Sequence, residues 1–119
     1  MRQPQAEQSV RFTFLRKEVI MVAKILIKRR FKQGKTKEIL ALLNEFRAGA
    51  MGQPGYISGV TMTAKDDPQT YLVIGTWQTM EDWLAWKENP KRKSFEEMLE
   101  IYLEKPTEYE EYLLGSPRP

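Results

Sequence analysis

The sequence predicts an α+β fold in which helices cover one face of a four-stranded antiparallel sheet. Three observations predict it. A run that alternates apolar and polar residues comes first, a stretch with apolar residues at helical spacing follows, and two adjacent strand-like runs then precede a second helical region and a last strand. The resulting order, β-α-β-β-α-β with a split second helix, packs simply as the ferredoxin-like arrangement.

The first predicted strand covers residues 22–31, and residues 32–34 form the turn after it. Because successive side chains of a strand point to opposite faces, the run divides into two sets. These sets are Ala23, Ile25, Ile27 and Phe31 on one face, and Lys24, Leu26, Lys28 and Arg30 on the other.

A helix is predicted over residues 35–51, with Thr36 as its N-cap. The glycine- and proline-containing stretch 52–55 ends it. Its apolar face consists of Ile39, Leu42, Leu43 and Phe46.

A β-hairpin follows, with strands at residues 56–64 and 70–77 and a turn at 65–69. The second helical leg comprises residues 80–88, capped by Thr79 and ending before Pro90, and residues 92–104. The apolar face of the latter helix consists of Phe95, Met98, Leu99 and Tyr102.

Pro106 ends this leg, and residues 107–114 form the last strand. The folded domain is therefore expected at residues 21–114. Residues 1–20 are expected to be an N-terminal tail or extension, and residues 115–119 a C-terminal tail.

Apolar residues stand on both faces of the predicted sheet, although helices can cover only one. They are Leu26, Tyr71 or Leu72, Val73 or Ile74, and Tyr109 or Tyr112. Because a large exposed apolar face usually marks an interface, we expect a homodimer that buries sheet against sheet.

The composition excludes several classes of chemistry. The chain of 119 residues contains neither cysteine nor histidine, which removes thiolate nucleophiles, histidine general bases and the commonest metal ligands. The acidic pairs at 66–67, 96–97 and 110–111 lack metal-ligand spacing, so no metal site is expected.

The charge and hydropathy of the chain indicate whether it binds nucleic acid or a membrane, and where in the cell it is located. The net charge is +3, and the basic run at residues 28–32 lies in a strand-like segment with no nucleic-acid-binding motif, so no nucleic-acid partner is expected. No apolar run is long enough for a membrane helix, and residues 1–20 lack a signal-peptide pattern. We therefore expect a cytoplasmic protein without a membrane partner.

All three tryptophans lie within ten residues, around the junction between the hairpin and the second helical leg. Trp83 is interpreted as core, in a stripe with Met80 and Leu84. Trp77 shares a strand face with Gly75 and is favoured as core. Trp86 lies at the edge of the helix's core face, where it either lines a pocket or simply packs.

The order of these features resembles the antibiotic biosynthesis monooxygenase family over residues 21–114. The resemblance rests on the "QPGY" turn at 53–56, the "DDP" of the hairpin, and Trp77 followed by Thr79, the acidic residues 81–82 and Trp86. It implies a dimeric α+β barrel. Some members of that superfamily oxygenate aromatic polyketides or quinols without metal or flavin, so the resemblance implies that no cofactor is needed.

Other members bind haem and degrade it with an asparagine, a tryptophan and a histidine. Trp86 matches that tryptophan, but Ile27 stands near the asparagine position and Glu96 near the histidine position. Two of the three residues are missing, so haem degradation is not expected.

The candidate pocket or substrate-binding residues are Trp86, Trp77, Arg92, Tyr71 and Ile27. Arg92 and Glu96 stand one helical turn apart. They form either a solvated or subunit-bridging ion pair, or a pocket group in which Arg92 binds an anionic part of the substrate. Asn44 and Arg47 are favoured as surface residues, and no catalytic residue can be chosen among the tyrosines.

Two functions remain open. The first is a small oxygenase that acts on an aromatic or quinol-type substrate between sheet and helices, and it requires a cavity of a few hundred Å³ or more. The second is a non-catalytic homodimeric domain that binds an aromatic or apolar ligand or serves in assembly. It predicts a small or filled gap beneath the helices.

Overall fold

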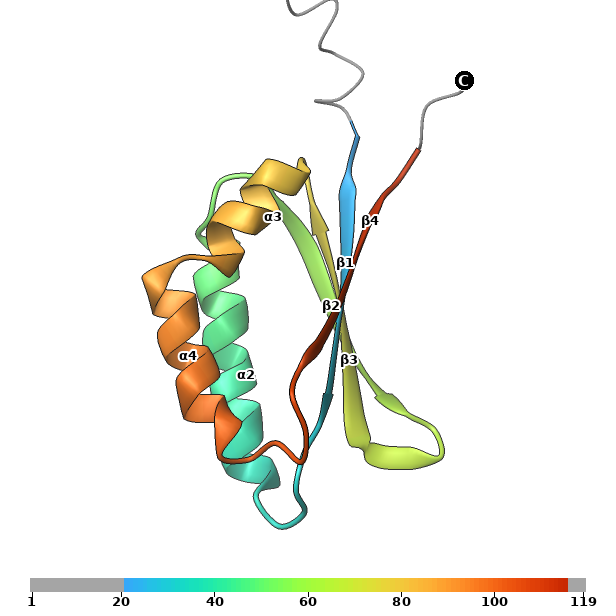
Figure 1. Ribbon diagram of the computed structural model, residues 1–119, viewed down its shortest axis with the longest axis vertical. Helices are drawn as coiled ribbons and strands as arrows, with labels where there is room; N and C mark the ends of the chain where they lie inside the picture. The colour runs from blue at the N-terminus through green and yellow to red at the C-terminus, as the bar shows by residue number, and fades with distance from the viewer. Residues whose placement is uncertain (1–20, 116–119) are drawn as a thin grey trace, which may run out of the picture.

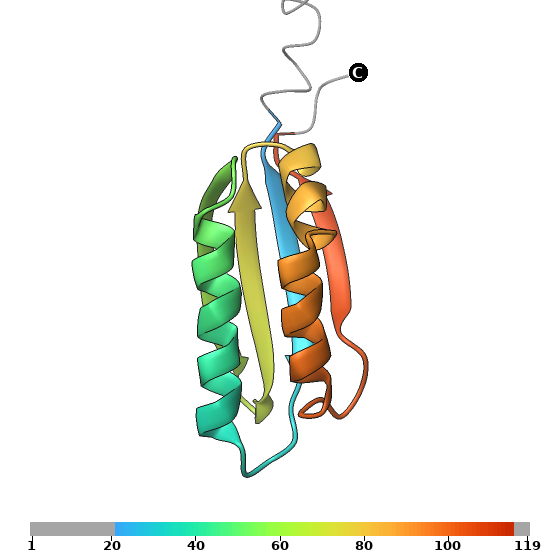
Figure 2. The same ribbon diagram turned by 90° about the vertical axis from the view of Figure 1, so that its left-hand side faces the viewer.

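The computed structural model describes residues 21–115, so the predicted tail at 1–20 and residues 116–119 lie outside the described part. The fold is the predicted α+β, ferredoxin-like one: four antiparallel strands in the order β2-β3-β1-β4, with the helices on one face. Figure 1 shows the sheet nearly edge-on with all labelled helices on one side, and Figure 2 shows them across that face.

Strand β1 (Ala23–Arg30) runs in the middle of the sheet, paired with β3 on one side and β4 on the other. Its side chains alternate as predicted, with Ala23, Ile25 and Ile27 buried beneath the helices. The same alternation places a charged residue, Arg29, on the buried face, where it is 3% exposed.

Helix α2 (Thr36–Met51) follows a turn and runs along the sheet in nearly the same line as the strands (Figure 2). The prediction that Thr36 caps this helix is wrong, because Thr36 is already its first helical residue. The capping position belongs to Lys35, whose side chain makes no cap hydrogen bond.

Strands β2 (Tyr56–Ala64) and β3 (Asp67–Trp77) form the predicted hairpin, but β3 begins three residues earlier than expected. Asp67 is held there by Arg30 of β1, whose Nε lies 2.8 Å from a carboxylate oxygen, and by the Thr70 hydroxyl, which donates to the same carboxylate. This anchoring extends the strand past Pro68.

Helices α3 (Met80–Lys87) and α4 (Pro90–Glu100) form the split second leg, and β4 (Glu108–Leu113) ends the sheet. Thr79 caps α3 as predicted, accepting from the Asp82 backbone N–H at 3.1 Å. Pro90 begins α4 instead of preceding it, because proline suits the first helical position and Asn89 supplies the cap. The expected bounds of about 92–104 are therefore wrong at the start, and they are wrong at the end too, where Ile101 forms the C-cap.

Two predicted core residues are exposed. Leu84 is 41% exposed and Met98 47%, because the buried faces of their helices are formed by Trp83 and Trp86 in α3, and by Phe95 and Leu99 in α4. Trp83 is buried, as predicted. Among residues 21–115, no helix combines the length and the apolar character that a membrane span requires.

Candidate functional site

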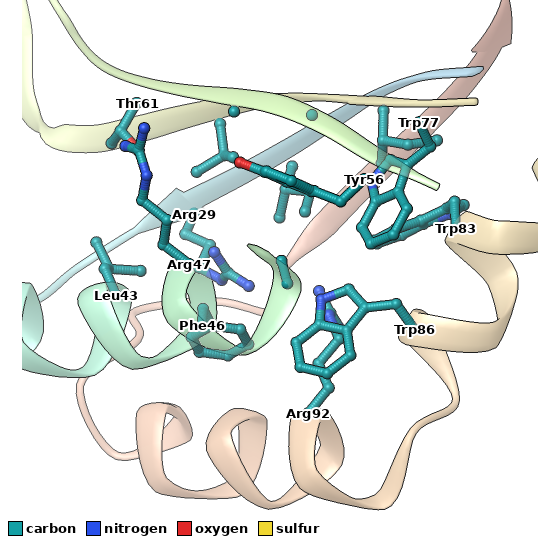
Figure 3. Close-up of a pocket in the computed structure, with 16 residues that line it drawn as sticks. Arg29, Leu43, Phe46, Arg47, Tyr56, Thr61, Trp77, Trp83, Trp86 and Arg92 are labelled. Carbon is teal, nitrogen blue, oxygen red and sulfur yellow. The ribbon is translucent and has the colours of Figure 1, made fainter. Parts of the chain in front are cut away.

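A cavity of about 80 Å³ lies between the sheet and the helices, and its exposed lining residues, Arg47 of α2 and Thr61 of β2, mark its mouth. Figure 3 shows the three tryptophans at one end of it, and Leu43, Arg47 and Thr61 at the other. The lining residues come from all layers of the fold. They are Ile25, Ile27, Arg29, Leu43, Phe46, Arg47, Ala50, Tyr56, Gly59, Thr61, Val73, Gly75, Trp77, Trp83, Trp86 and Arg92.

Four of the five candidate residues line this cavity, namely Trp86, Trp77, Arg92 and Ile27. Tyr71 does not. It packs edge-on against Phe31, with ring centroids 5.2 Å apart, in the second core cluster. Of the two polar residues of α2 that were expected at the surface, Asn44 is exposed, and Arg47 is exposed but also lines the cavity mouth.

Trp86 both lines the cavity and fills space beside it. It is 3% exposed, and its six-membered ring rests against Gly49 of α2, where an added Cβ would lie 2.6 Å from Cη2. Among residues 21–115, its indole N–H has no protein acceptor. This side chain therefore offers the cavity an aromatic surface and a free donor.

Tyr56 crosses the middle of the cavity, with its ring lying along the sheet (Figure 3). Its hydroxyl oxygen lies over Gly59, where an added Cβ would come within 2.8 Å of it, so Gly59 must lack a side chain for this placement. The ring meets Trp77 edge-on, with centroids 5.3 Å apart. In the sequence Tyr56 is a strand tyrosine like several others, and only the fold shows that it occupies the cavity.

Two buried arginines stand on the wall of the cavity and share one carboxylate. Arg29 Nη2 donates to Glu96 Oε2 at 2.9 Å, and Arg92 Nη2 lies 3.1 Å from the same oxygen. The Tyr109 hydroxyl donates to this oxygen at 2.6 Å and accepts from Arg92 Nη2 at 3.1 Å. We call Arg29, Arg92, Glu96 and Tyr109 the arginine cluster.

Arg92 and Glu96 form an ion pair within one chain, and the alternative in which this pair is solvated is wrong. Arg92 is 3% exposed within a single chain, and its guanidinium carbon lies 5.2 Å from the centroid of the Trp83 ring and 5.4 Å from that of Phe46. The hydrophobic stem and flat guanidinium of arginine suit such aromatic surroundings.

Arg29 is the residue that sequence reasoning missed, although the strand's period of two contains the signal. It lies on the inner face between Ile27 and Phe31, and its guanidinium carbon lies 4.9 Å from the Phe46 centroid. Its Nε is buried and has no hydrogen-bond partner within the described residues.

The contacts within the arginine cluster, together with burial, shift the pKa values of Glu96 and Tyr109. Burial acts to raise the pKa of Glu96, but the charge of Arg29, the Tyr109 hydroxyl and Arg92 outweigh it, and the pKa lies below its ordinary value. Burial raises the pKa of Tyr109, and the neighbouring Glu96 carboxylate adds to this effect. Glu96 is therefore ionised and Tyr109 protonated near neutral pH, so neither is ready to act as a base.

A second, open pocket of about 520 Å³ lies beyond the arginine cluster, lined by the end of α4 and the segment leading to β4. Glu96 and Tyr109 line this second pocket, whereas Arg29 and Arg92 line the inner cavity, so the arginine cluster lies between the two. Within residues 21–115, no group of three or more acidic side chains is arranged to hold a metal ion.

The sequence of residues 22–98 matches the model of a family described as "Antibiotic biosynthesis monooxygenase". A comparison with curated proteins finds no match.

Solved structures share the fold at low sequence identity. A conserved protein from Methanosarcina mazei is 17% identical, with a TM-score of 0.73 over 82% of this chain and 97% of its own. A protein from Nitrosomonas europaea, named for the same family, is 16% identical, with a TM-score of 0.73 over 82% of this chain and 94% of its own. A variant of SnoaB, a cofactor-independent oxygenase from Streptomyces nogalater, is 13% identical, with a TM-score of 0.71 over 82% of this chain and 97% of its own.

Proposed function

The chain belongs to the antibiotic biosynthesis monooxygenase family, and from that premise we propose that it is a small oxygenase that uses neither metal nor flavin and acts on an aromatic, quinol-type substrate. The single observation that carries the proposal is the composition of the inner cavity: in the described part of the chain its lining has aromatic walls, three arginines and no acidic residue. SnoaB, a cofactor-independent oxygenase of the same fold, provides a precedent.

This composition favours the anionic form of an electron-rich ring. The indoles of Trp77 and Trp86 exclude water from one end of the cavity, and Arg29 and Arg92 supply positive charge at its wall. In such an enclosure a charge interaction is stronger than in water, so a quinol bound there loses a proton more easily. The resulting quinolate is the form that gives an electron to oxygen most readily.

The proposed reaction balances without a further reductant. The quinolate passes one electron to O₂, and the semiquinone and superoxide so formed combine at a ring carbon to give a peroxide. The peroxide takes up a proton, and loss of water then breaks the O–O bond. One quinol and one O₂ give one hydroxyquinone and one water.

The cavity volume requires that a side chain move when a substrate binds. An engineered cavity of about 150 Å³ is known to hold benzene, whereas this cavity measures about 80 Å³. Movement of the Tyr56 side chain would supply the additional volume. Its ring crosses the cavity, and its hydroxyl makes no hydrogen bond within residues 21–115 that would hold it there.

The alternative is a non-catalytic domain that binds the same kind of ligand. Two observations favour it: the small volume of the cavity, and the protonation of the arginine cluster, which leaves Glu96 and Tyr109 unsuited to remove a proton. Under this alternative the ligand binds but is not oxidised.

Oxygen consumption with hydroquinone as substrate separates the two functions. We expect turnover above the uncatalysed rate, one hydroxyquinone formed per O₂, and a loss of about tenfold or more in kcat/KM for Trp86→Ala, because the ring is no longer enclosed. Trp86→Phe, which keeps an aromatic ring against Gly49, controls for loss of folding and should retain part of the activity. Turnover that is absent, or equal in wild type and Trp86→Ala, would contradict the oxygenase.

We also propose that the protein forms a homodimer through the face of the sheet that carries no helix (Figure 1). Cross-strand pairing places Val60 opposite Ile74, and Ile74 opposite Leu26. Met62 and Leu72 continue this apolar surface, and both Val60 and Met62 are more than 40% exposed. Burying such a surface against a second copy is favourable.

A further inference from the structure

We propose that the ligand of the inner cavity is a single-ring aromatic carboxylate, and that Arg29 of β1 binds its carboxylate group. This inference deepens the proposed function and rests on it for the place where the ligand binds. It adds a charged group to the ligand and assigns a residue to hold that group.

The first argument is the unpaired donor of Arg29. The side chain is 3% exposed, and its Nε is buried without a partner within the described residues. Within residues 21–115, Nη2 is the one nitrogen of this guanidinium that donates a hydrogen bond, to Glu96. Buried N–H groups are almost always hydrogen-bonded in folded proteins, so an acceptor beyond residues 21–115 is expected here, and we assign it to the ligand.

The second argument is charge. Arg29 and Arg92 share the single carboxylate of Glu96, so among the residues that the structure describes one positive charge in the wall of the cavity has no partner. The lining residues found within 21–115 include no Asp or Glu, and Arg47 adds a further positive charge at the mouth of the cavity. A neutral ligand would leave this charge uncompensated, whereas a monoanion balances it.

The third argument concerns the kind of anion. A carboxylate is flat and carries one negative charge, which suits the planar guanidinium and the single unbalanced charge. A phosphate group also fits the guanidinium fork, but it brings up to two negative charges where the buried arginine cluster leaves one positive charge free, and the exposed Arg47 at the mouth is already solvated. The remaining walls, formed by Trp77, Trp86 and Val73, are apolar and suit a ring attached to the carboxylate.

Tyr56 shows where that ring would lie. Its own ring already occupies the middle of the cavity, edge-on to Trp77, and it extends from the edge strand β2 beside the opening. A ligand whose carboxylate reaches Arg29 takes the place of the Tyr56 ring, which turns outward. One aromatic ring is thus exchanged for another against the same wall.

Anaerobic calorimetry on the full chain tests this inference with two quinols that differ in one group. 2,5-Dihydroxybenzoate carries the carboxylate, and hydroquinone does not. We expect wild type to bind 2,5-dihydroxybenzoate about tenfold or more tightly than hydroquinone. In Arg29→Lys, which keeps a positive charge for Glu96 but lacks Nε and the planar fork, we expect this preference to disappear.

Arg30→Lys is the matched control, because Arg30 is the next residue of β1, faces the opposite side and pairs with Asp67. It should leave the preference unchanged.

Equal affinities for the two quinols in wild type, no binding of either, or a preference that survives in Arg29→Lys would each overturn the inference. The wild-type comparison does not depend on how well any variant folds. The outcomes also separate this inference from the proposed oxygenase. If wild type prefers 2,5-dihydroxybenzoate but consumes no oxygen, the carboxylate site is supported and the oxygenase is contradicted. If wild type oxidises hydroquinone but binds both quinols equally well, the oxygenase is supported and the carboxylate site is contradicted.

Discussion

Trp86 of α3 rests directly on Gly49 of α2, so closely that a Cβ atom on Gly49 would lie 2.6 Å from Trp86 Cη2 and 3.2 Å from Cζ2. The contact fixes the distance between α2 and α3 at one end of the inner cavity. It also decides which part of Trp86 is available to a ligand, because the six-membered ring is occupied by packing.

Gly49→Ala should therefore destabilise the protein, although the same change in a helix interior usually stabilises it. The new methyl group meets a large, buried ring that has little room to shift, and overpacking of this kind costs about 1–3 kcal/mol of the free energy of unfolding. Chemical denaturation measures the effect. Gly52→Ala is the matched control, because its φ is −87° and an added Cβ would meet nothing closer than 3.7 Å. Equal stability of the two variants would contradict the tight contact.

The order of strands and helices was predictable because it depends on local periodicity and on turn residues. Apolar alternation in β1 and helical spacing in α2 were sufficient to identify those elements. The boundaries were less predictable where a distant partner decides them. β3 starts at Asp67 because Arg30 of another strand holds that residue, and such pairing is not visible in a local pattern.

A second prediction follows from the arginine cluster and concerns how the stability of the protein changes at acid pH. The pKa of Glu96 is lowered in the folded protein, so its carboxylate contributes stability above the unfolded value of 4.5 and loses that contribution as the pH falls through the folded pKa. Near neutral pH we expect Glu96→Gln to lower the free energy of unfolding by about 2–3 kcal/mol, because two buried guanidiniums lose their counter-charge. This difference from wild type should shrink as the pH falls below 4.5.

Denaturation curves between neutral pH and pH 3 provide the measurement. Asp67, whose pKa the Arg30 hydrogen bonds lower to about 2, titrates alike in both proteins and cancels in the comparison. Glu97→Gln is the control on the same helix, since Glu97 is exposed and has no ion pair within residues 21–115. A difference between wild type and Glu96→Gln that stays constant with pH would show that the charge of Glu96 is not responsible.

The cluster also shows why the candidate site was only partly predictable. Trp86 and Arg92 were accessible to sequence reasoning, because each occupies a recognisable position relative to a helix face. Arg29 was not, because a charged residue within a strand is normally assigned to the solvent face. Its burial depends on Glu96, which is contributed by a helix far along the chain.

Tyr56 provides a third prediction. Tyr56→Ala should enlarge the inner cavity and strengthen binding of 2,5-dihydroxybenzoate severalfold, because the ligand ring no longer has to displace a side chain. It should also lower the free energy of unfolding by about 1–2 kcal/mol, since the edge-to-face contact with Trp77 is lost. Calorimetry and chemical denaturation measure the two effects. Tyr56→Phe, which keeps the ring, should resemble wild type in both. Weaker binding to Tyr56→Ala would mean that Tyr56 contacts the ligand instead of blocking it.

The last prediction concerns the sheet face that carries no helix. Val60 lies there on β2, opposite Ile74 of β3, and is 52% exposed in the single chain. If this face meets a second copy, a glutamate at position 60 places a charge in an apolar interface without a partner, whereas in the monomer the same charge would be solvated. Light scattering after size-exclusion chromatography should give twice 14.0 kDa for wild type and 14.0 kDa for Val60→Glu.

Leu40→Glu is the matched control, because Leu40 is an apolar residue of similar exposure, 43%, on α2 and away from that face. It should leave the dimer intact. A wild-type mass of one chain, or dissociation by Leu40→Glu but not by Val60→Glu, would rule out an interface between the two sheets.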